Sequence, residues 1–438
     1  MAEYYCLGIK GAGMSTLACI LHDLGNTVVG YDDHAGHKYT QEGLEARGIE
    51  VFYDHDHPLA PGAILTHSRA LRDDHPEIVR ARAAGLKFAE YNQVLGQLTA
   101  QFHTIGVSGA HGKTTTTSLI AHIIDAVSGC NYFIGDGTGH AERGNDVFVI
   151  EADEFNRHFL AYHPELAVIT NIELDHVECY NGLGEYMAAF EQFGNKAQLV
   201  VACGDDDNVR AIDFTSPVKY FGFGEANDIV ARNVVLGKDG TSFDCFIGGE
   251  FFGAFKMPVA GAHMALDALA AIAACQYCGI SAADIATHMA TYVTAKRRFK
   301  ESYFGDVVSI DDYAHHPTEL RVTLRTARLK YPEKQVVAVF LPNTYSRTDA
   351  LMGDFVSVLK IADKAYVMDI DCDRERPEDY PGVTSDTLIA QVPGAEKVSV
   401  ASVAKLLRHK DAAICFMSCA DIAPIKDAFD ALAASANV

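Results

Sequence analysis

Basic residues are scarce in this sequence: 36 Lys and Arg stand against 58 Asp and Glu, which gives a formal net charge of −22 at pH 7. Nucleic acids and anionic membrane surfaces bind proteins through clustered Lys and Arg. The deficit therefore predicts no nucleic-acid partner and no membrane partner. Long apolar runs are also missing, since none approaches the ~20 residues of a membrane span. No basic-plus-apolar leader precedes the first predicted strand, so we expect a cytoplasmic protein.

Repeats, low-complexity segments and long linkers are absent as well, so any hinges between domains are expected to be short. The 438 residues, 49% of them hydrophobic, are enough for about three packed domains of ~150 residues each. The odd count of 11 cysteines excludes complete internal pairing and favours buried thiols in a reducing compartment. Cys275 and Cys278 form a C-x-x-C inside an Ala-rich helical run, where small core residues are favoured over a zinc or redox site.

Short apolar segments alternate with helical ones along the chain, which is typical of parallel sheets covered by helices. The pattern predicts an α/β fold of three domains: a Rossmann-like domain at 1–98, a central P-loop ATPase domain at 99–295, and a second Rossmann-like domain at 296–438. The central sheet is expected to be mostly parallel. Asp228–Pro258 interrupts it with alternating residues and glycine turns, which predicts an antiparallel hairpin appendage. The predicted strands are Tyr4–Leu7, Thr27–Tyr31, Ala63–Thr66, His103–Val107, Val147–Glu151, Leu166–Thr170, Leu199–Ala202, Val307–Ile310, Val336–Phe340, Ala365–Met368 and Ala413–Phe416.

The most informative stretch is Gly109-Ala110-His111-Gly112-Lys113-Thr114-Thr115-Thr116, between a predicted strand and an apolar helix at Ser118–Val127. Glycines there let backbone N–H groups and the positive end of the helix converge on one point. A Lys and a Thr hydroxyl make that point suitable for a nucleoside triphosphate and Mg²⁺. The usual first glycine is replaced by Val107, with Gly106 one residue earlier.

A second glycine-rich turn lies near the start of the chain, at Gly8–Ser15, and Asp32 ends the following strand. Glycines allow close approach to a pyrophosphate, and an acidic residue at this distance receives a ribose hydroxyl. This arrangement predicts a nucleotide-diphosphate ligand, with NAD and a UDP-sugar both open.

Polar motifs follow two further strands of the central domain. Glu151-Ala152-Asp153-Glu154 and Thr170-Asn171-Ile172-Glu173-Leu174-Asp175-His176 each begin where a predicted strand ends. Parallel strands bring their carboxyl ends to one edge of a sheet, so both motifs are expected beside the phosphate loop. Carboxylates and a neutral imidazole at that edge predict a metal site.

The last domain opens with the only dense basic cluster, Lys296-Arg297-Arg298-Phe299-Lys300, from which an Arg is expected to reach the γ-phosphate. Two adjacent histidines beside two aspartates, at 311–316, are unsuited to a core and predict a site. The polar stretch 341–348 also follows a strand, and its Arg347 is suited to a bidentate clamp on a carboxylate.

Taken together, these motifs resemble the Mur ligase family, which builds the peptide stem of bacterial cell-wall precursors, over essentially the whole chain. Asp-Asp-Tyr-Ala-His-His-Pro-Thr-Glu at 311–319, Thr-Tyr-Ser-Arg-Thr at 344–348 and Arg-His-Phe-Leu at 157–160 resemble the branch of the family that adds L-alanine. The resemblance implies that ATP phosphorylates the carboxylate of UDP-N-acetylmuramate. The amine of L-alanine then attacks the acyl phosphate, and ADP and phosphate are released.

The same resemblance implies roles for individual residues, with ATP and Mg²⁺ as cofactors. The expected catalytic residues are Lys113, His176, Arg298, His315 and His316. Those that hold ATP are Gly109, Ala110, His111, Gly112, Lys113, Thr114, Thr115 and Asp312, and those that hold Mg²⁺ are Thr114, Glu151 and His176. Those that contact UDP-N-acetylmuramate or L-alanine are Gly11, Ala12, Gly13, Met14, Ser15, Asp32, His263, Tyr313, Arg347 and Arg374.

Three segments depart from the family pattern. Met264 and Asp267 replace the two asparagines of the family's His-Asn-x-x-Asn, and Met417–Asp421 replaces a Gly-Ala-Gly-Asp turn. Where sister ligases carry a carbamylated lysine, this chain has Phe190 and Glu191, as expected of the alanine-adding branch.

Other interpretations of the sequence remain. One is a ligase that attaches a recovered tripeptide to the same sugar nucleotide, and another is a non-catalytic nucleotide-binding relative. An NAD dehydrogenase is the weakest, because the phosphate loop and the histidine pair would have no role. The expected oligomeric state is a monomer or a weak homodimer.

Overall fold

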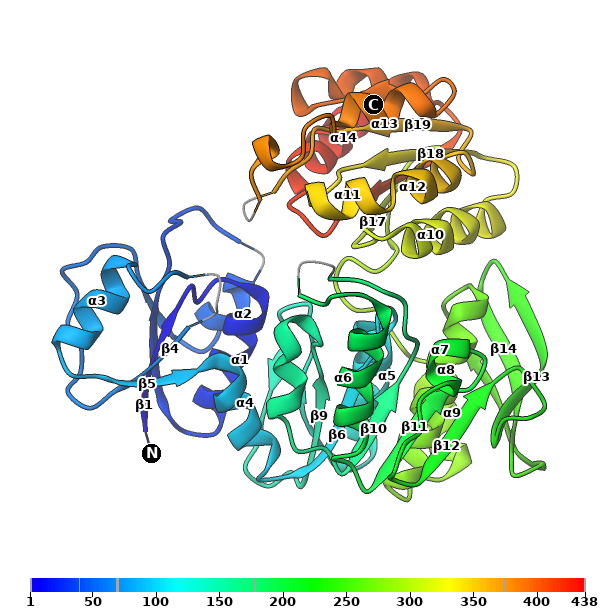
Figure 1. Ribbon diagram of the computed structural model, residues 1–438. Helices are drawn as coiled ribbons and strands as arrows, with labels where there is room; N and C mark the ends of the chain where they lie inside the picture. Colours follow the sequence, from blue (N-terminus) through cyan, green and yellow to red (C-terminus); the bar gives the residue numbers. More distant parts are fainter. Residues whose placement is uncertain (1, 39, 68–70, 177–178, 373–374, 437–438) are drawn as a thin grey trace.

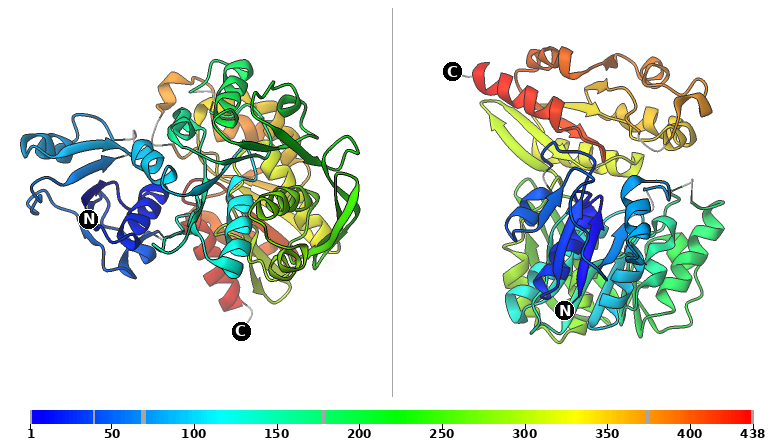
Figure 2. Two further views of the ribbon diagram at one scale, coloured as in Figure 1. Left: turned by 90° about the horizontal axis from the view of Figure 1, so that it is seen from below. Right: turned by 90° about the vertical axis from the view of Figure 1, so that its left-hand side faces the viewer.

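The computed structural model describes every residue except 1, 39, 68–70, 177–178, 373–374 and 437–438. The fold is α/β with three domains, each built on its own mostly parallel sheet, as the sequence predicts. In Figure 1 the N-terminal sheet lies at the left, the middle sheet at the lower right and the C-terminal sheet at the top. Figure 2 shows from two further sides that the C-terminal domain lies over the middle domain, whereas the N-terminal domain projects to one side.

The N-terminal sheet is entirely parallel and has the strand order β3-β2-β1-β4-β5. The strands β3 and β5, at the two edges of the sheet, were not predicted. The strand β5 is largely exposed and has no apolar run that would mark it in the sequence. The strands are β1 Glu3–Leu7, β2 Thr27–Tyr31, β3 Glu50–Phe52, β4 Ile64–His67 and β5 Lys87–Glu90, and the helices are α1 Ala12–Asp23, α2 Gln41–Glu45, α3 Pro76–Ala83 and α4 Tyr91–Thr99.

The middle sheet has ten strands in the order β15-β14-β13-β12-β11-β10-β6-β9-β7-β8. The predicted antiparallel segment is confirmed as β13, β14 and β15, which turn at the two expected glycine sites and extend the parallel sheet without a break. The strands are β6 His103–Ser108, β7 Asn131–Phe133, β8 Gly139–His140, β9 Val147–Glu151, β10 Leu166–Ile169, β11 Leu199–Cys203, β12 Val218–Gly222, β13 Ile229–Gly237, β14 Gly240–Ile247 and β15 Glu250–Met257. The helices are α5 Lys113–Ser128, the 3₁₀ segment Phe155–Ala161, α6 Leu183–Gly194, α7 Asp207–Arg210, α8 Ala262–Tyr277 and α9 Ala282–Met289.

The C-terminal sheet has the order β16-β17-β21-β18-β19-β20, with only β16 antiparallel to its neighbour. Its strands are β16 Lys300–Phe304, β17 Val307–Asp312, β18 Gln335–Phe340, β19 Lys364–Val367, β20 Glu396–Lys397 and β21 Ala412–Met417. The α-helices are α10 Pro317–Lys330, α11 Tyr345–Ala350, α12 Met352–Leu359, α13 Ser385–Gln391 and α14 Ala423–Ala436, with 3₁₀ segments at Pro377–Asp379 and Val400–Arg408.

The middle sheet has a hydrophobic core on each of its two faces. One hydrophobic core is shared, because Leu17 of α1 and Leu95 of α4 pack in the same cluster as Phe148 and Phe190 of the middle domain. The other face of the middle sheet is covered by α5, α8 and α9. Cys275 is fully buried there, and Cys278 borders the same core, so the C-x-x-C pair packs as small core residues.

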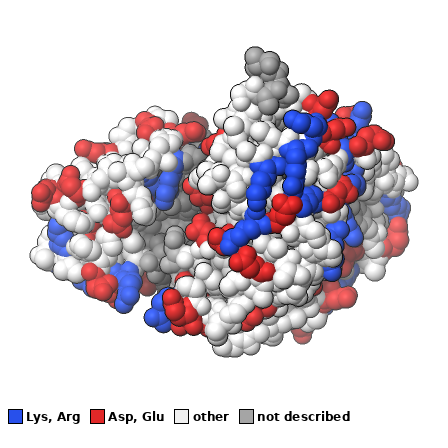
Figure 3. All heavy atoms as spheres, turned by 90° about the horizontal axis from the view of Figure 1, so that it is seen from above, with Lys and Arg blue, Asp and Glu red and all other residues white. Residues whose placement is uncertain are grey.

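The surface carries charges of both signs. Acidic side chains are scattered over the view from above, and a band of Lys and Arg side chains crosses the right-hand lobe (Figure 3). Among the described residues, no helix is both long enough and apolar enough to cross a bilayer.

The aromatic core under the phosphate-binding edge yields a stability prediction. Phe193 of α6 is fully buried and stacks on Phe159 with ring centroids 4.9 Å apart. Phe193→Ala should lower the free energy of unfolding of the middle domain by about 3–5 kcal/mol, because the ring leaves a cavity. Urea unfolding followed by hydrogen exchange of the middle domain measures the change. Phe251→Ala, at a 59% exposed side chain, is the control and should change it by less than ~0.5 kcal/mol; equal losses in the two variants would contradict the packing argument.

Candidate active site

The phosphate loop joins β6 to α5 through two glycines in the left-handed region. Gly109 has φ +140°, and a Cβ there would collide with Thr170 Oγ1. Gly112 has φ +82°, and a Cβ would lie 2.7 Å from Asp267 Oδ1. Only glycine fits both positions, so the backbone can approach a ligand closely. This explains why Val107, inside β6, can replace the usual first glycine: the working glycine is Gly109.

Lys113 lies at the start of α5 and is surrounded by acceptors. Its Nζ donates to Gly109 O at 2.5 Å and to Glu154 Oε1 at 2.9 Å. Burial would lower the pKa of Lys113, but the charges of Glu154 and Glu151 raise it, so the ammonium stays charged. Burial raises the pKa of both glutamates despite that ammonium. A bound polyphosphate would therefore find one cation in place among carboxylates that can accept a metal ion.

Arg298 reaches the phosphate loop from the C-terminal domain. Its Nη2 donates to Thr114 Oγ1 at 3.1 Å, and this hydroxyl lies 3.0 Å from Glu151 Oε1. The other oxygen of Glu151 accepts from Gly135 N at 2.8 Å. One guanidinium from a distant part of the chain thus meets two of the predicted Mg²⁺ ligands.

The third predicted ligand, His176, forms a group with Asp153 and Glu154, whose ligand atoms and its own all lie within 4.8 Å of one another. His176 Nε2 is 3.7 Å from Glu154 Oε1, and Glu154 Oε2 is buried with no hydrogen-bond partner. Carboxylate and hydroxyl oxygens at this edge are the ligand type that Mg²⁺ prefers. The structure thus groups His176 with Asp153 and Glu154, and Thr114 with Glu151; Glu154 was not singled out as a ligand from the sequence.

These groups line a central cavity of ≈ 310 Å³ to which all three domains contribute. Gly13 and Tyr91 come from the N-terminal domain, and His315, Arg347 and Cys419 from the C-terminal domain. Arg347 is held by an ion pair with Asp175, its Nη2 2.8 Å from Oδ1. The remaining predicted residues of this cavity are Ala110, His111, Gly112, Lys113, Thr114, Glu151, His176, Arg298 and Tyr313.

A second cavity of ≈ 540 Å³ lies between the middle and C-terminal domains and shares Gly112 and Arg298 with the first. Thr115 and Asp312, both predicted to hold ATP, line it. His263, which was predicted to contact the acceptor substrates, lines the same cavity and not the central one. Asp312 is buried at the end of β17, and burial raises its pKa to about 6. Burial also lowers the pKa of His263 to about 4, which keeps the imidazole neutral.

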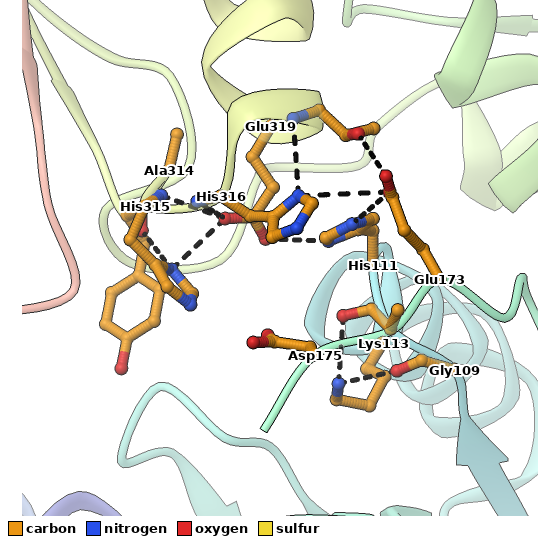
Figure 4. A network of polar contacts seen from close by, with 12 residues as sticks. Gly109, His111, Lys113, Glu173, Asp175, Ala314, His315, His316 and Glu319 are labelled. Carbon is orange, nitrogen blue, oxygen red and sulfur yellow. Dashed lines mark hydrogen bonds and ion pairs between the residues drawn. The ribbon is translucent and has the colours of Figure 1, made fainter. Parts of the chain in front are cut away.

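The histidine pair divides between two environments (Figure 4). His315 lines the central cavity, with Nδ1 3.1 Å from Glu319 Oε2. His316 is 2% exposed, lines neither cavity, and packs its ring 4.8 Å from that of His111. Its side chain accepts from Thr318 N at the start of α10. Both histidines were predicted to be catalytic, whereas the structure places them in different surroundings.

His111 of the phosphate loop bridges two domains (Figure 4). Its Nε2 is 2.9 Å from Glu173 Oε2 and its Nδ1 is 3.3 Å from Glu319 Oε1 of α10. Burial would lower the pKa of His111, but these carboxylates raise it to about 9. Both ring nitrogens then donate, which ties the phosphate loop to the C-terminal domain.

The first glycine turn differs in detail from the prediction. The helix α1 begins at Ala12, within the stretch predicted as a turn, so Met14 and Ser15 are buried inside it. Asp32 Oδ2 accepts from Lys10 N at 3.0 Å and thus braces the turn. Only Gly13 of the turn lines the central cavity, where a Cβ would lie 2.5 Å from Tyr91 Oη.

Several cavity residues had no signal in the sequence. Tyr91, Phe155 and Tyr162 line the central cavity beside the predicted motifs. Each lies in or next to a helix, outside the predicted glycine turns and strand ends. Of the predicted residues, Arg374 lies outside the described part of the chain.

Comparison with known proteins agrees with this geometry. Three consecutive family profiles match: "Mur ligase family, catalytic domain" at 3–103, "Mur ligase middle domain" at 107–275 and "Mur ligase, glutamate ligase domain" at 297–417. The chain belongs to the Mur ligase family. Members of this family are ATP-dependent ligases, which accounts for a phosphate loop at a three-domain junction.

Relatives within the Mur ligase family match over their full length. The UDP-N-acetylmuramate–L-alanine ligase of Lacticaseibacillus casei strain BL23 is 41% identical over 434 residues, covering 99% of each chain, and that of Lacticaseibacillus paracasei strain ATCC 334 is 40% identical with the same coverage. The crystal structure of UDP-N-acetylmuramate–alanine ligase from Thermotoga maritima superposes with a TM-score of 0.83 at 26% identity, covering 100% of each chain. A murein peptide ligase from Psychrobacter arcticus has the same fold, with a TM-score of 0.74 at 20% identity over 99% of each chain.

The Asp267 departure from the Mur ligase pattern yields a pH prediction. Burial raises the pKa of Asp267 from 3.8 to about 7, so the folded protein holds a proton that the unfolded chain releases. The wild type should therefore lose stability as the pH rises from about 4 to 7, by at most about 1.4 kcal/mol per pH unit from this group. Asp267→Asn, which restores the family's amide, should lack this loss and be the more stable protein at pH 8.

Urea unfolding of both proteins at pH 4, 5.5, 7 and 8 measures the difference. The exposed Asp239→Asn in the β13–β14 turn is the matched control and should leave the pH profile of the wild type unchanged. A stability difference between wild type and Asp267→Asn that does not vary with pH would show that Asp267 is ionised in the folded state.

Proposed function

We propose that the protein joins L-alanine to the carboxylate of UDP-N-acetylmuramate and consumes ATP, releasing ADP and phosphate. The observation that carries the proposal is the central cavity, where one chain combines a phosphate loop, a metal-ligand group and the His315–Arg347 side. The two relatives that match over 99% of their length carry the same activity in their names.

ATP would bind along the two cavities, with its phosphates on the phosphate loop. Lys113 and Arg298 both supply positive charge to the cavity that Thr114 lines, which suits a γ-phosphate that gains charge during transfer. Thr115, His263 and Asp312 would line the nucleoside end. Mg²⁺ would be held by Thr114, Glu151 and His176, joined by Glu154, and would neutralise the phosphate oxygens.

The acceptor carboxylate would approach from the N-terminal domain. Gly13 packs closely against Tyr91 at the cavity, next to Gly11 and Ala12, and backbone N–H groups at the start of α1 favour a pyrophosphate. Met14 and Ser15 would contribute only through their backbone, because their side chains are buried.

L-alanine would bind on the C-terminal side, where Arg347 and His315 face the cavity beside Tyr313. The Arg347 guanidinium suits the carboxylate of the amino acid. Closure of the third domain over this space excludes water from the acyl phosphate, which would otherwise be hydrolysed. His316 would act through His111, by positioning the phosphate loop.

The remaining assignments follow from the same proposal. The expected oligomeric state is a monomer or a weak homodimer, and the three domains of one chain suffice to line the site. The domain boundaries stay at 1–98, 99–295 and 296–438. Free cysteines and the use of ATP favour the cytoplasm.

The activity is tested by phosphate release from purified protein given ATP, Mg²⁺, UDP-N-acetylmuramate and L-alanine. Release should require all four components, and chelation of Mg²⁺ should abolish it. A tripeptide that replaces L-alanine with equal or better kcat/KM would identify the protein as a recycling ligase. ATP binding without release of phosphate in any combination would identify a non-catalytic relative.

Lys113→Ala should lower kcat by at least about 10³-fold and leave the fold intact, because the ammonium supplies charge and little packing. Turnover is measured by phosphate release, and the fold by far-UV circular dichroism. Lys410→Ala, at an exposed lysine far from the site, is the matched control. Turnover of Lys113→Ala within tenfold of that control would refute the proposed role.

A further inference from the structure

The turn after β21 presents a thiol to the central cavity. Arg297 holds this turn in place: its Nη2 donates to Ser418 O at 2.7 Å and its Nη1 to Ala420 O at 3.3 Å. Ser418 Oγ donates to Leu341 O at 2.8 Å. Between these fixed points, Cys419 lines the cavity at its amino-acid end.

Three charged side chains surround this thiol. Cys419 interacts with the His315 imidazole and with the Arg347 guanidinium. His315 is oriented by Glu319, whose Oε2 lies 3.1 Å from Nδ1, so its other nitrogen is on the opposite edge of the ring. A carboxylate that orients an imidazole, which in turn meets a thiol, is the arrangement that activates nucleophilic cysteines.

The environment of Cys419 differs from that of the other cysteines. Burial would raise its pKa, but His315 and Arg347 hold it below the ordinary value. Burial raises the pKa of the following described cysteines: Cys6, Cys19, Cys130, Cys203, Cys245, Cys275, Cys278 and Cys415. The thiolate is the reactive form of cysteine, so selective chemistry is expected at one position.

We propose that Cys419 is a modification site: a reactive thiolate that small electrophiles and hydroperoxides reach through the central cavity. The consequence rests on the proposed function: modification of Cys419 would block the space for L-alanine and stop the ligase.

The chemistry balances without a further reagent. With a hydroperoxide as oxidant, Sγ attacks the terminal oxygen, an S–O bond forms and the O–O bond breaks. The leaving oxygen takes a proton from the His315 imidazolium, and the cysteine becomes a sulfenic acid. With a haloacetamide, an S–C bond forms and halide leaves.

Alkylation of the full-length protein by iodoacetamide, mapped by mass spectrometry, tests the proposal. At pH 7, Cys419 should react at least about tenfold faster than Cys372, a partly exposed cysteine outside the cavity lining, which serves as the internal control. His315→Gln should slow Cys419 at pH 7 by about tenfold and move its rate profile to higher pH, without changing Cys372. Equal rates for the two cysteines, or a Cys419 profile unaffected by His315→Gln, would overturn the proposal.

Labelling is read by mass, so it does not depend on turnover and separates this proposal from the proposed function. If the protein is a ligase, activity should fall in step with Cys419 labelling or peroxide treatment, and L-alanine should slow both. Cys419→Ser, with its own starting activity set to 100%, should lose no activity under the same treatment. Loss of activity in Cys419→Ser at the wild-type rate would place the inactivating modification elsewhere.

Discussion

The carboxylate of Glu319 is the contact on which the site depends. One oxygen accepts the backbone N–H groups of His315 and His316, at 2.9 and 3.2 Å, and so fixes the start of α10. The other oxygen meets His111 of the phosphate loop. Burial would raise the pKa of Glu319, but His315 and His111 hold it well below its usual value. One charged group thus begins a helix in the C-terminal domain and binds that helix to the ATP side of the middle domain.

The charges around the phosphate loop can be buried only because they alternate in sign. Lys113 meets Glu154, Arg298 approaches Glu151 through Thr114, and His111 lies between two glutamates. An unpaired charge in this position would cost several kcal/mol, whereas paired charges cost far less. A bound nucleotide and metal ion would exchange these pairs for new ones, so the site is organised before its ligands arrive.

The fold and the site differ in how well the sequence predicts them. The strands β6 and β9 were predicted correctly, because a strand that is buried on both faces has a continuous apolar run in the sequence. The edge strand Lys87–Glu90 was missed, because its packing is one-sided. Residues at strand ends were found as well, since parallel strands align those ends. Tyr91 and the separation of His315 from His316 were not found, because both depend on how domains meet.

The Asp267 departure need not disable the nucleotide side, and the reason is its burial. A protonated carboxyl has the shape of an amide and, like it, offers one donor and one acceptor group. With a pKa near 7, Asp267 keeps its proton over most of the acidic range. Its carboxyl group lies beside Gly112 of the phosphate loop. Ionisation of Asp267 would place a negative charge near Arg298 and the bound polyphosphate. That charge would attract Arg298 but repel the polyphosphate. ATP therefore favours the protonated form, and its binding should take up a proton when the pH exceeds that pKa.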